Sequence, residues 1–167
     1  MGKIAEKRVT VDMDGDFVVF LIGMRINKFW KPWKWMPVAG AMPRMITELM
    51  QKPEIGMLHA RSHFGLRNVM VVQYWKSFEH LHAYAVSKEA EHLPAWKAFN
   101  KAVGANGDVG IWHETYLVPA GQYEAIYGNM PTYGLAHAGN VVDAAGRARS
   151  ARGRLRQSDG ADQPVAD

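Results

Sequence analysis

The pattern of apolar and polar positions along the chain predicts four main strands and a short fifth. Residues 16–25 form a continuous apolar run that is typical of a buried strand. Residues 54–64 and 69–75 are two further β-rich runs, and the short Gly-containing connection between them is typical of a hairpin. Residues 108–118 give the fourth strand, and residues 123–127 a short fifth. Along the chain, the two strands of the hairpin thus lie between the first strand and the fourth, and the short fifth follows the fourth.

Helical spacing of apolar residues lies between these strands. It appears over residues 42–51, 77–86 and 88–103. Residues 26–40 contain two closely spaced prolines, and a proline inside a helix removes a hydrogen bond and clashes with the preceding turn, so we expect a structured loop there. The resulting order is β-α-β-β-α-β with a split second helix.

This order predicts a ferredoxin-like α+β fold, in which helices cover one face of an antiparallel sheet. The strands are apolar on both sides, so the second face needs a cover as well. Two copies that press these faces together supply it, and we therefore expect a homodimer, a dimeric α+β barrel whose gap between sheet and helices holds a ligand. We expect residues 1–15 to be an N-terminal arm, 16–138 the barrel domain with a C-terminal wrap, and 139–167 a disordered tail.

Composition narrows the function classes. The net charge is +4, but the arginine-rich tail from residue 143 contributes only +1, so the body is mildly basic and we expect no nucleic-acid partner. The tail has almost nothing large to bury, which predicts disorder. The chain has no cysteine, no apolar run long enough to span a bilayer and no signal-peptide pattern at its N-terminus. We expect a cytoplasmic protein with no membrane span.

The sequence also lacks several well-known catalytic patterns. It has no Gly-x-Ser-x-Gly nucleophile elbow and no His-Glu-x-x-His zinc motif. It likewise has no Gly-x-Gly-x-x-Gly or phosphate-binding loop, so nucleotide cofactors are not indicated. The seven histidines are therefore the best acid–base groups near neutral pH and the strongest ligands for a metal or haem.

Two histidines lie on otherwise apolar faces. His92 shares a helical stripe with Trp96, so it points at apolar surroundings, as a core or interface histidine satisfied by a hydrogen bond does. His113 shares a strand face with Val109 and Ile111, so it is bonded to a neighbouring strand or lines a pocket. Both alternatives stay open for His113.

A second set of polar residues alternates on one strand. His59, Arg61 and His63 share a strand face that turns from apolar to basic along its length. Such a face suits a cleft that opens to solvent and receives an anion, such as a carboxylate or a phenolate. The alternative is an ordinary half-exposed strand.

Aromatic residues gather in two segments. Trp30, Trp33 and Trp35 alternate with lysines and prolines, and this segment could be a lid over an apolar ligand, a dimer contact, an anchor on a membrane surface, or simply packing on the barrel. Tyr123, Tyr127 and Asn129, with Tyr133, lie in residues 120–135 and could orient a ligand carbonyl or wrap the barrel mouth.

Several segments resemble known proteins. The segment VVQYWKSFEHLHAYAVSKEAEHLPAW resembles the antibiotic-biosynthesis-monooxygenase type of dimeric α+β barrel. Residues 10–138 are more similar still to a bacterial monooxygenase-like family of unknown function, on the segments MRINKFWKPWKWMPV, YWKSFEHLHAYA and WHETYLVPAGQYEAIYGNMPTYGL. The Arg-rich tail lies outside this resemblance.

The resemblance implies a small oxidoreductase, or a haem-dependent lyase such as a dehydratase, that acts on an apolar organic molecule in the barrel. It implies His113 as the acid–base group with Arg61 and Tyr127 beside it, and His92 as the metal ligand, next to Trp96, should haem be the cofactor; otherwise no cofactor is needed. The substrate pocket would be lined by further residues: His59, His63, Trp30, Trp33, Trp35, Tyr123 and Asn129. The alternative is a dimeric protein that binds or senses haem or a hydrophobic small molecule without turnover.

Overall fold

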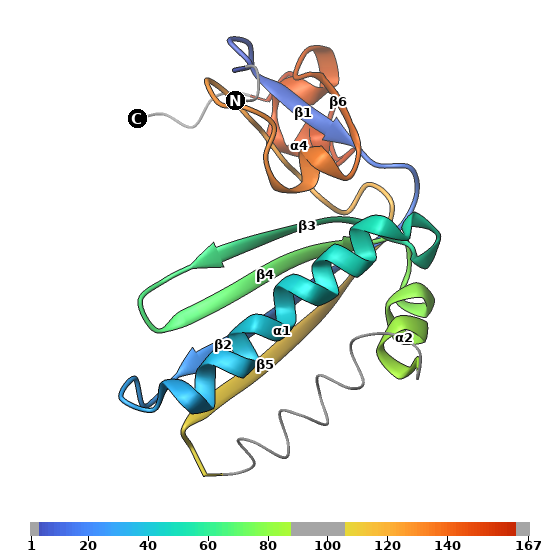
Figure 1. Ribbon diagram of the computed structural model, residues 1–167. Coiled ribbons are helices and arrows are strands. Elements are labelled where there is room, and N and C mark those ends of the chain that lie inside the picture. The colour runs from blue at the N-terminus through green and yellow to red at the C-terminus, as the bar shows by residue number, and fades with distance from the viewer. Residues whose placement is uncertain (1–3, 88–105, 163–167) are drawn as a thin grey trace. The chain divides into compact units, whose positions relative to one another are not determined.

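The computed structural model describes residues 4–87 and 106–162 (Figure 1). The chain forms two compact units. One is Val18–Tyr116, and the other combines Met1–Phe17 with Leu117–Asp167. Expected boundaries at residues 15 and 138 differ from this division, because the segment after residue 117 makes its contacts with the N-terminal arm.

The larger unit is built on an antiparallel sheet with strand order β3-β4-β2-β5. The bounds are β2 Phe17–Ile26, β3 Met57–Phe64, β4 Asn68–Trp75 and β5 Val109–Val118. These strands match the predicted ones to within three residues at each end. The expected hairpin joins β3 to β4, and the amide of Gly65 donates to the carbonyl of Asn68 at 2.8 Å.

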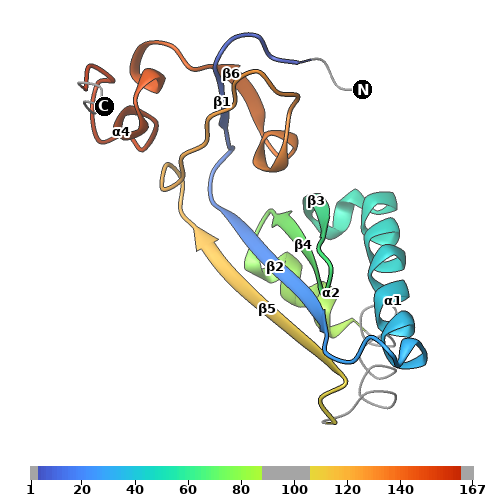
Figure 2. The same cartoon turned by 90° about the vertical axis from the view of Figure 1, so that its left-hand side faces the viewer.

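Helices cover one face of this sheet, as the ferredoxin-like α+β prediction requires. They are α1 (Pro32–Gln51), the 3₁₀ turn η1 (Pro53–Ile55) and α2 (Phe78–Val86). Figure 2 shows α1 running along one side of the sheet. The core between these layers holds Val18, Leu49, Met57, Trp75, Leu81 and Tyr84. A second cluster joins Met24, Ile26 and Val109 to Trp35 and Val38 near the start of α1.

The structured loop predicted for residues 26–40 is wrong, because α1 begins at Pro32 and continues for 20 residues. Pro32 lies in the first turn, where the helix needs no amide donor. Pro37 and Pro43 lie inside the helix on its exposed side, and each removes one backbone hydrogen bond. Burial of the opposite side of α1 against the sheet outweighs these losses. The helix predicted over residues 42–51 is its second half.

Helix α2 begins as predicted. The hydroxyl of Ser77 accepts from the amide of His80, and Ser77 has extended backbone angles, so it is an N-cap. The helix predicted over residues 88–103 lies outside the described residues.

The smaller unit contains a two-stranded antiparallel sheet, β1 (Val9–Asp12) with β6 (Asn140–Asp143). Short helical turns follow: η2 (Gly134–His137), η3 (Gly146–Arg149) and α4 (Ala151–Arg154). The disordered tail expected over residues 139–167 is therefore replaced by ordered elements as far as residue 162. The strand expected over residues 123–127 is reduced to one bridge, between Val9 and Tyr127.

Pairing with distant residues orders this tail. Residues Val9 to Asp12 pair with Asn140 to Asp143, and the Arg154 guanidinium forms an ion pair with Glu124. The side chains of Thr10 and Val11 are buried in the same unit. The tail's composition is poor in large apolar residues, but the N-terminal arm supplies the surface against which it packs.

Candidate functional site

His113 lies on β5, on the side of the sheet that carries the helices. Its ring lies 5.7 Å from the ring of Phe20 on the neighbouring strand β2, at an angle of 41°. Val109, on the same side of β5, packs into the core beneath α1. The imidazole itself is exposed. An exposed imidazole beside an aromatic ring can take a proton from an organic molecule that packs on that ring.

The opposite side of the sheet, the open face, holds the basic residues of β3. His59 pairs with Tyr74 across the β3–β4 ladder, Arg61 with Val72, and His63 with Met70. Since Ala60 packs against the core on the helix side, its neighbours His59 and Arg61 point the other way. The rings of His59 and Tyr74 stack with their centroids 6.5 Å apart. The three basic residues thus share one face, as their spacing predicts.

Arg61 and His113 therefore lie on opposite faces of one sheet. The sequence suggested that both serve a single site, and a single chain does not bring them together. The alternation of side chains along each strand is the cause, since neighbouring residues point to opposite faces. Which face a whole strand presents to the helices is decided only by packing.

The open face of β5 carries a second polar group. The hydroxyl of Tyr116 donates to a carboxylate oxygen of Glu114 at 2.5 Å. This hydrogen bond and the charge of Glu114 raise the pKa of Tyr116 above its usual value of 10.0. Trp112, on the same face, lies against Gly23 of β2, where a Cβ atom would come within 2.7 Å of the indole nitrogen. Apolar Val19, Leu21, Met70 and Val72 complete this face between the two polar edges.

The three tryptophans near the start of α1 do not share one environment. Trp35 packs into the core, its indole nitrogen donating to the carbonyl of Phe29 at 3.2 Å. Trp30 and Trp33 are 67% and 65% exposed. Trp35 is therefore a packing residue, which leaves Trp30 and Trp33 as surface residues.

Tyr123, Tyr127 and Asn129 belong to the smaller unit. The hydroxyl of Tyr123 accepts from the amide of Met13 at 2.7 Å, and its ring packs edge-on against Phe17. Burial raises the pKa of Tyr127, which is half-buried. Asn129 has a positive φ of 54°, and its amide donates to the carbonyl of Ala5. Their visible contacts hold the C-terminal wrap against the N-terminal arm.

His92 and Trp96 lie outside the described residues. Among residues 4–87 and 106–162, no group of three histidine, aspartate or glutamate side chains is arranged to hold a metal ion.

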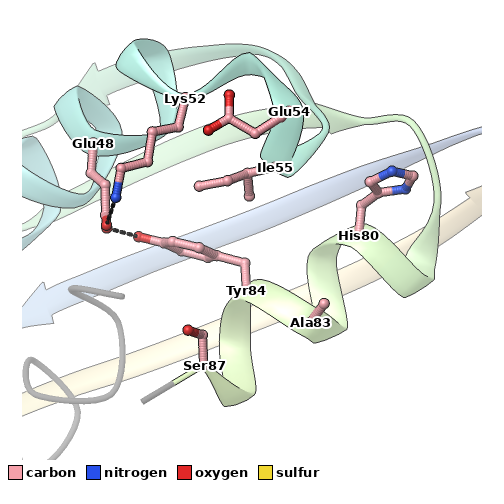
Figure 3. A pocket seen from close by; sticks show the side chains of 8 residues that line it. All are labelled: Glu48, Lys52, Glu54, Ile55, His80, Ala83, Tyr84 and Ser87. Carbon is pink, nitrogen blue, oxygen red and sulfur yellow. Dashed lines mark hydrogen bonds and ion pairs between the residues drawn. The ribbon is translucent and has the colours of Figure 1, made fainter. Parts of the chain in front are cut away.

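A pocket of about 380 Å³ lies between the C-terminal end of α1, η1 and α2 (Figure 3). Glu48 lines it from α1: the hydroxyl of Tyr84 donates to one of its oxygens at 3.2 Å, and Lys52 pairs with the other at 3.1 Å. His80 lines the side near η1 and contacts the hydroxyl of Ser77 through Nδ1 at 2.9 Å. Sequence reasoning missed this group, because Glu48 and Tyr84 are 36 residues apart and no local pattern connects them.

A buried carboxylate was also missed. Asp108 is 2% exposed and forms ion pairs with Lys28 at 2.7 Å and Lys31 at 3.1 Å. These two ammonium groups hold the pKa of Asp108 below its usual value of 3.8. The backbone carbonyl of Asp108 also accepts from the amides of Asn27 and Lys28. The group fixes the start of β5 to the segment that leads into α1, which is a structural role.

The profile of the Monooxygenase af470-like family matches residues 17–135, from the start of β2 to η2. The chain belongs to this family. The match includes every strand of the larger sheet and the segments WHETY and YEAIYGNMP, so the monooxygenase-like resemblance predicted from sequence is confirmed. Among the described residues, no helix is both long and apolar enough to cross a bilayer.

One curated member of the Monooxygenase af470-like family gives a direct comparison. Over 86 residues, 48% of this chain, the sequence is 33% identical to Monooxygenase af470 of Aspergillus fumigatus. That stretch covers 30% of the fungal protein, so this chain matches less than a third of its relative's length.

Several solved structures are similar to part of this chain at low identity. SnoaB of Streptomyces nogalater, a cofactor-independent oxygenase, matches 60% of this chain and 91% of its own at 10% identity, with a TM-score of 0.44. A possible oxidoreductase of Bacteroides thetaiotaomicron matches 62% and 99% at 9% identity, with a TM-score of 0.47. A dimeric ferredoxin-like protein of Jannaschia matches 58% and 97% at 17% identity, with a TM-score of 0.41.

Proposed function

We propose that this member of the Monooxygenase af470-like family is an oxidoreductase that oxygenates an apolar organic molecule beside His113. Membership of the family over residues 17–135 carries the proposal. The position of His113 supports it: the imidazole is exposed, lies on the helix side of β5 and contacts the ring of Phe20. An aromatic substrate can pack on Phe20 while an acidic C–H or O–H group points at the imidazole.

The chemistry needs only a base and oxygen. His113 takes a proton from an activated carbon or an acidic phenol, and the imidazolium that forms stabilises the carbanion or phenolate next to it. The carbanion transfers electrons to O₂ and forms a C–O bond, giving a hydroperoxide. Loss of water from the hydroperoxide leaves a carbonyl group. In balance, a CH₂ group and O₂ give C=O and H₂O, so oxygen is the only oxidant.

Oxygen uptake tests this role. The purified chain is incubated with a panel of polycyclic phenols and 1,3-dicarbonyl compounds, and consumption of O₂ and incorporation of isotopically heavy oxygen into product are measured. His113→Ala and His113→Asn should lower the rate by about 10²–10⁴-fold, the usual effect of removing a general base. The matched control is His82→Asn, an exposed histidine on α2 whose ring stacks on Phe78.

A binding protein without turnover is the competing function, and the same experiment separates the two. Tight binding of a phenol with no oxygen uptake, or uptake that survives in His113→Asn, contradicts the proposed chemistry.

The resemblance also implies haem as a cofactor, with His92 as its iron ligand. Titration with haemin settles that branch: a Soret band that is lost in His92→Ala supports haem ligation, and an unchanged spectrum at stoichiometric haemin removes it.

We further propose that two copies cover each other's open face. The described helices of the larger unit, α1 and α2, pack on the other side of its sheet, so the apolar centre of the open face needs a partner (Figure 2). Contacts of Trp112 with Gly23 and of Gly110 with Arg25 show that β5 runs antiparallel to β2. Glu114 is therefore level with Leu21, in the same row as Arg61 of β3.

Charge complementarity then favours one pairing of the two copies. A two-fold axis parallel to the strands places the β3 edge of each copy over the β5 edge of the other, so that Arg61 faces Glu114. Sedimentation velocity tests this arrangement. Glu114→Arg should weaken the dimer, and adding Arg61→Glu should restore it, because the exchanged charges again attract. A monomeric native chain, or a double variant weaker than Glu114→Arg, contradicts the arrangement.

A further inference from the structure

One end of the larger unit exposes five large apolar side chains. Trp30 and Trp33, 67% and 65% exposed, lie at the start of α1, with Met36 one turn further on. Phe64 and Leu66, 80% and 87% exposed, lie at the tip of the β3–β4 hairpin. We call these five residues the aromatic end. Isolated exposed apolar residues are ordinary, but five at one end of a sheet mark a binding surface.

Several contacts hold the two parts of the aromatic end together. The amide of Ile26 donates to the carbonyl of Arg67 at 2.8 Å, and the Arg67 guanidinium donates to the carbonyl of Asn27 at 3.2 Å. The same guanidinium lies 5.3 Å from the centre of the Phe29 ring. Figure 1 shows the hairpin tip and the segment between β2 and α1 at the same end of the sheet. The hairpin tip and the segment that leads into α1 therefore lie at the same end of the sheet, and each carries exposed apolar residues.

Positive charge surrounds this surface. Five basic residues lie in or beside it: Arg25, Lys28, Lys31, Lys34 and Arg67. The acidic residue among them, Asp108, is buried between Lys28 and Lys31. Among the described residues, these six groups sum to a net charge of about +4 at this end if every group is ionised.

We propose that the aromatic end docks on an anionic lipid surface. Tryptophan is the residue that best occupies the boundary between acyl chains and headgroups, because its ring is apolar and its N–H is polar. Lysine and arginine beside it keep their charges at the headgroup level while their stems lie on apolar surface. This is a peripheral contact of a folded unit and adds to the proposed oxygenation.

Charge also argues against a second copy as the occupant. A two-fold contact through this surface would bring the same patch of both copies together, and therefore two ends of charge about +4. The resulting repulsion disfavours self-association here. An anionic bilayer attracts the same end, with a gain of about fivefold in affinity for each basic residue near the membrane.

Vesicle flotation tests the proposal with the full chain. Vesicles of phosphatidylcholine alone are compared with vesicles that also contain phosphatidylglycerol. The chain should float with the anionic vesicles, less so as salt is raised, and its tryptophan fluorescence should shift to shorter wavelength. Trp30→Ala with Trp33→Ala should lower the vesicle affinity by about tenfold or more, since both rings lose their burial in lipid.

Matched variants on the same helix are the controls. Met50, 69% exposed at the far end of α1, gives Met50→Ala, which should leave vesicle binding unchanged. Lys34→Gln should lower affinity by about fivefold, whereas Arg44→Gln, exposed further along α1, should have a clearly smaller effect.

Two results would overturn the proposal. The first is a native chain that does not float with anionic vesicles; if its oligomer also dissociates when Trp30 and Trp33 are replaced, the aromatic end is a contact between copies. The second is equal loss of binding in Met50→Ala and in the double tryptophan variant.

Discussion

Replacement of Gly23 by alanine tests the packing of the open face. Gly23 lies on β2, and a Cβ atom there would come within 2.7 Å of Nε1 of Trp112 and 2.8 Å of the carbonyl oxygen of Val69. An ordinary contact between heavy atoms is about 3.5–4.0 Å, so roughly 0.7 Å is missing on both sides. The indole can rotate away, but the Val69 carbonyl belongs to the backbone of β4 and can move only if the strands separate.

Overpacking of this kind costs about 1–3 kcal/mol, so we expect Gly23→Ala to lower the free energy of unfolding by that amount. For a chain of this length each kcal/mol lowers the melting temperature by about 2–4 °C. Urea denaturation followed by tryptophan fluorescence measures the loss. Adding Trp112→Ala to Gly23→Ala should cost less than the sum of the two single losses, because the indole half of the clash is then absent.

Gly110→Ala is the matched control for this substitution. Gly110 lies on the neighbouring strand β5, and the nearest atom to a Cβ there is Nδ2 of Asn27 at 3.8 Å, an ordinary contact. We expect a change within about 0.5 kcal/mol. The reasoning is refuted if Gly23→Ala is as stable as the native chain, or if both glycine variants lose the same stability.

Three further predictions concern stability. Asp108 has a lowered pKa, so its ion pairs stabilise the fold above pH 3.8, and this stabilisation is lost as the pH falls through the folded-state pKa. Asp108→Asn should therefore have a lower melting temperature than the native chain at pH 7, and the difference between the two should shrink in acid. Thermal melts at a series of pH values measure this. Pro43→Ala should raise the melting temperature, because the alanine restores an amide donor inside α1 and removes a clash, together up to about 3 kcal/mol; an unchanged or lower value contradicts this account. Ser77→Ala should cost about 1 kcal/mol in urea denaturation by removing the N-cap of α2, whereas Ser77→Asp should restore most of the loss.

The sequence predicted the elements that depend on local pattern. The apolar runs located β2 and β5, the Gly-containing connection located the β3–β4 hairpin, and Ser77 located the start of α2. Alternation along β3 correctly placed His59, Arg61 and His63 on one face. These signals succeed because a strand exposes alternate residues to opposite sides and a helix start needs a polar cap, whatever the rest of the chain does.

The failures all involve partners distant in sequence. Pro37 opposes a helix by its own chemistry, but the buried side of α1 outweighs it. Residues 140–143 look unable to order themselves, yet they pair with β1 more than 120 residues earlier. Glu48 and Tyr84 meet across two helices, and Lys28 and Lys31 meet Asp108 across the sheet edge. Local propensity is a weak term, and burial or pairing with a remote surface overrides it.

By itself, therefore, the sequence predicted the four strands of the larger sheet, the ferredoxin-like α+β class and the monooxygenase-like family. The tertiary structure decided which groups share a surface. It separated His113 from Arg61, placed Trp35 in the core and left Trp30 and Trp33 exposed. The physical reason is that side-chain alternation fixes relative faces along one strand, whereas the face that meets the helices is chosen by the packing of the whole unit.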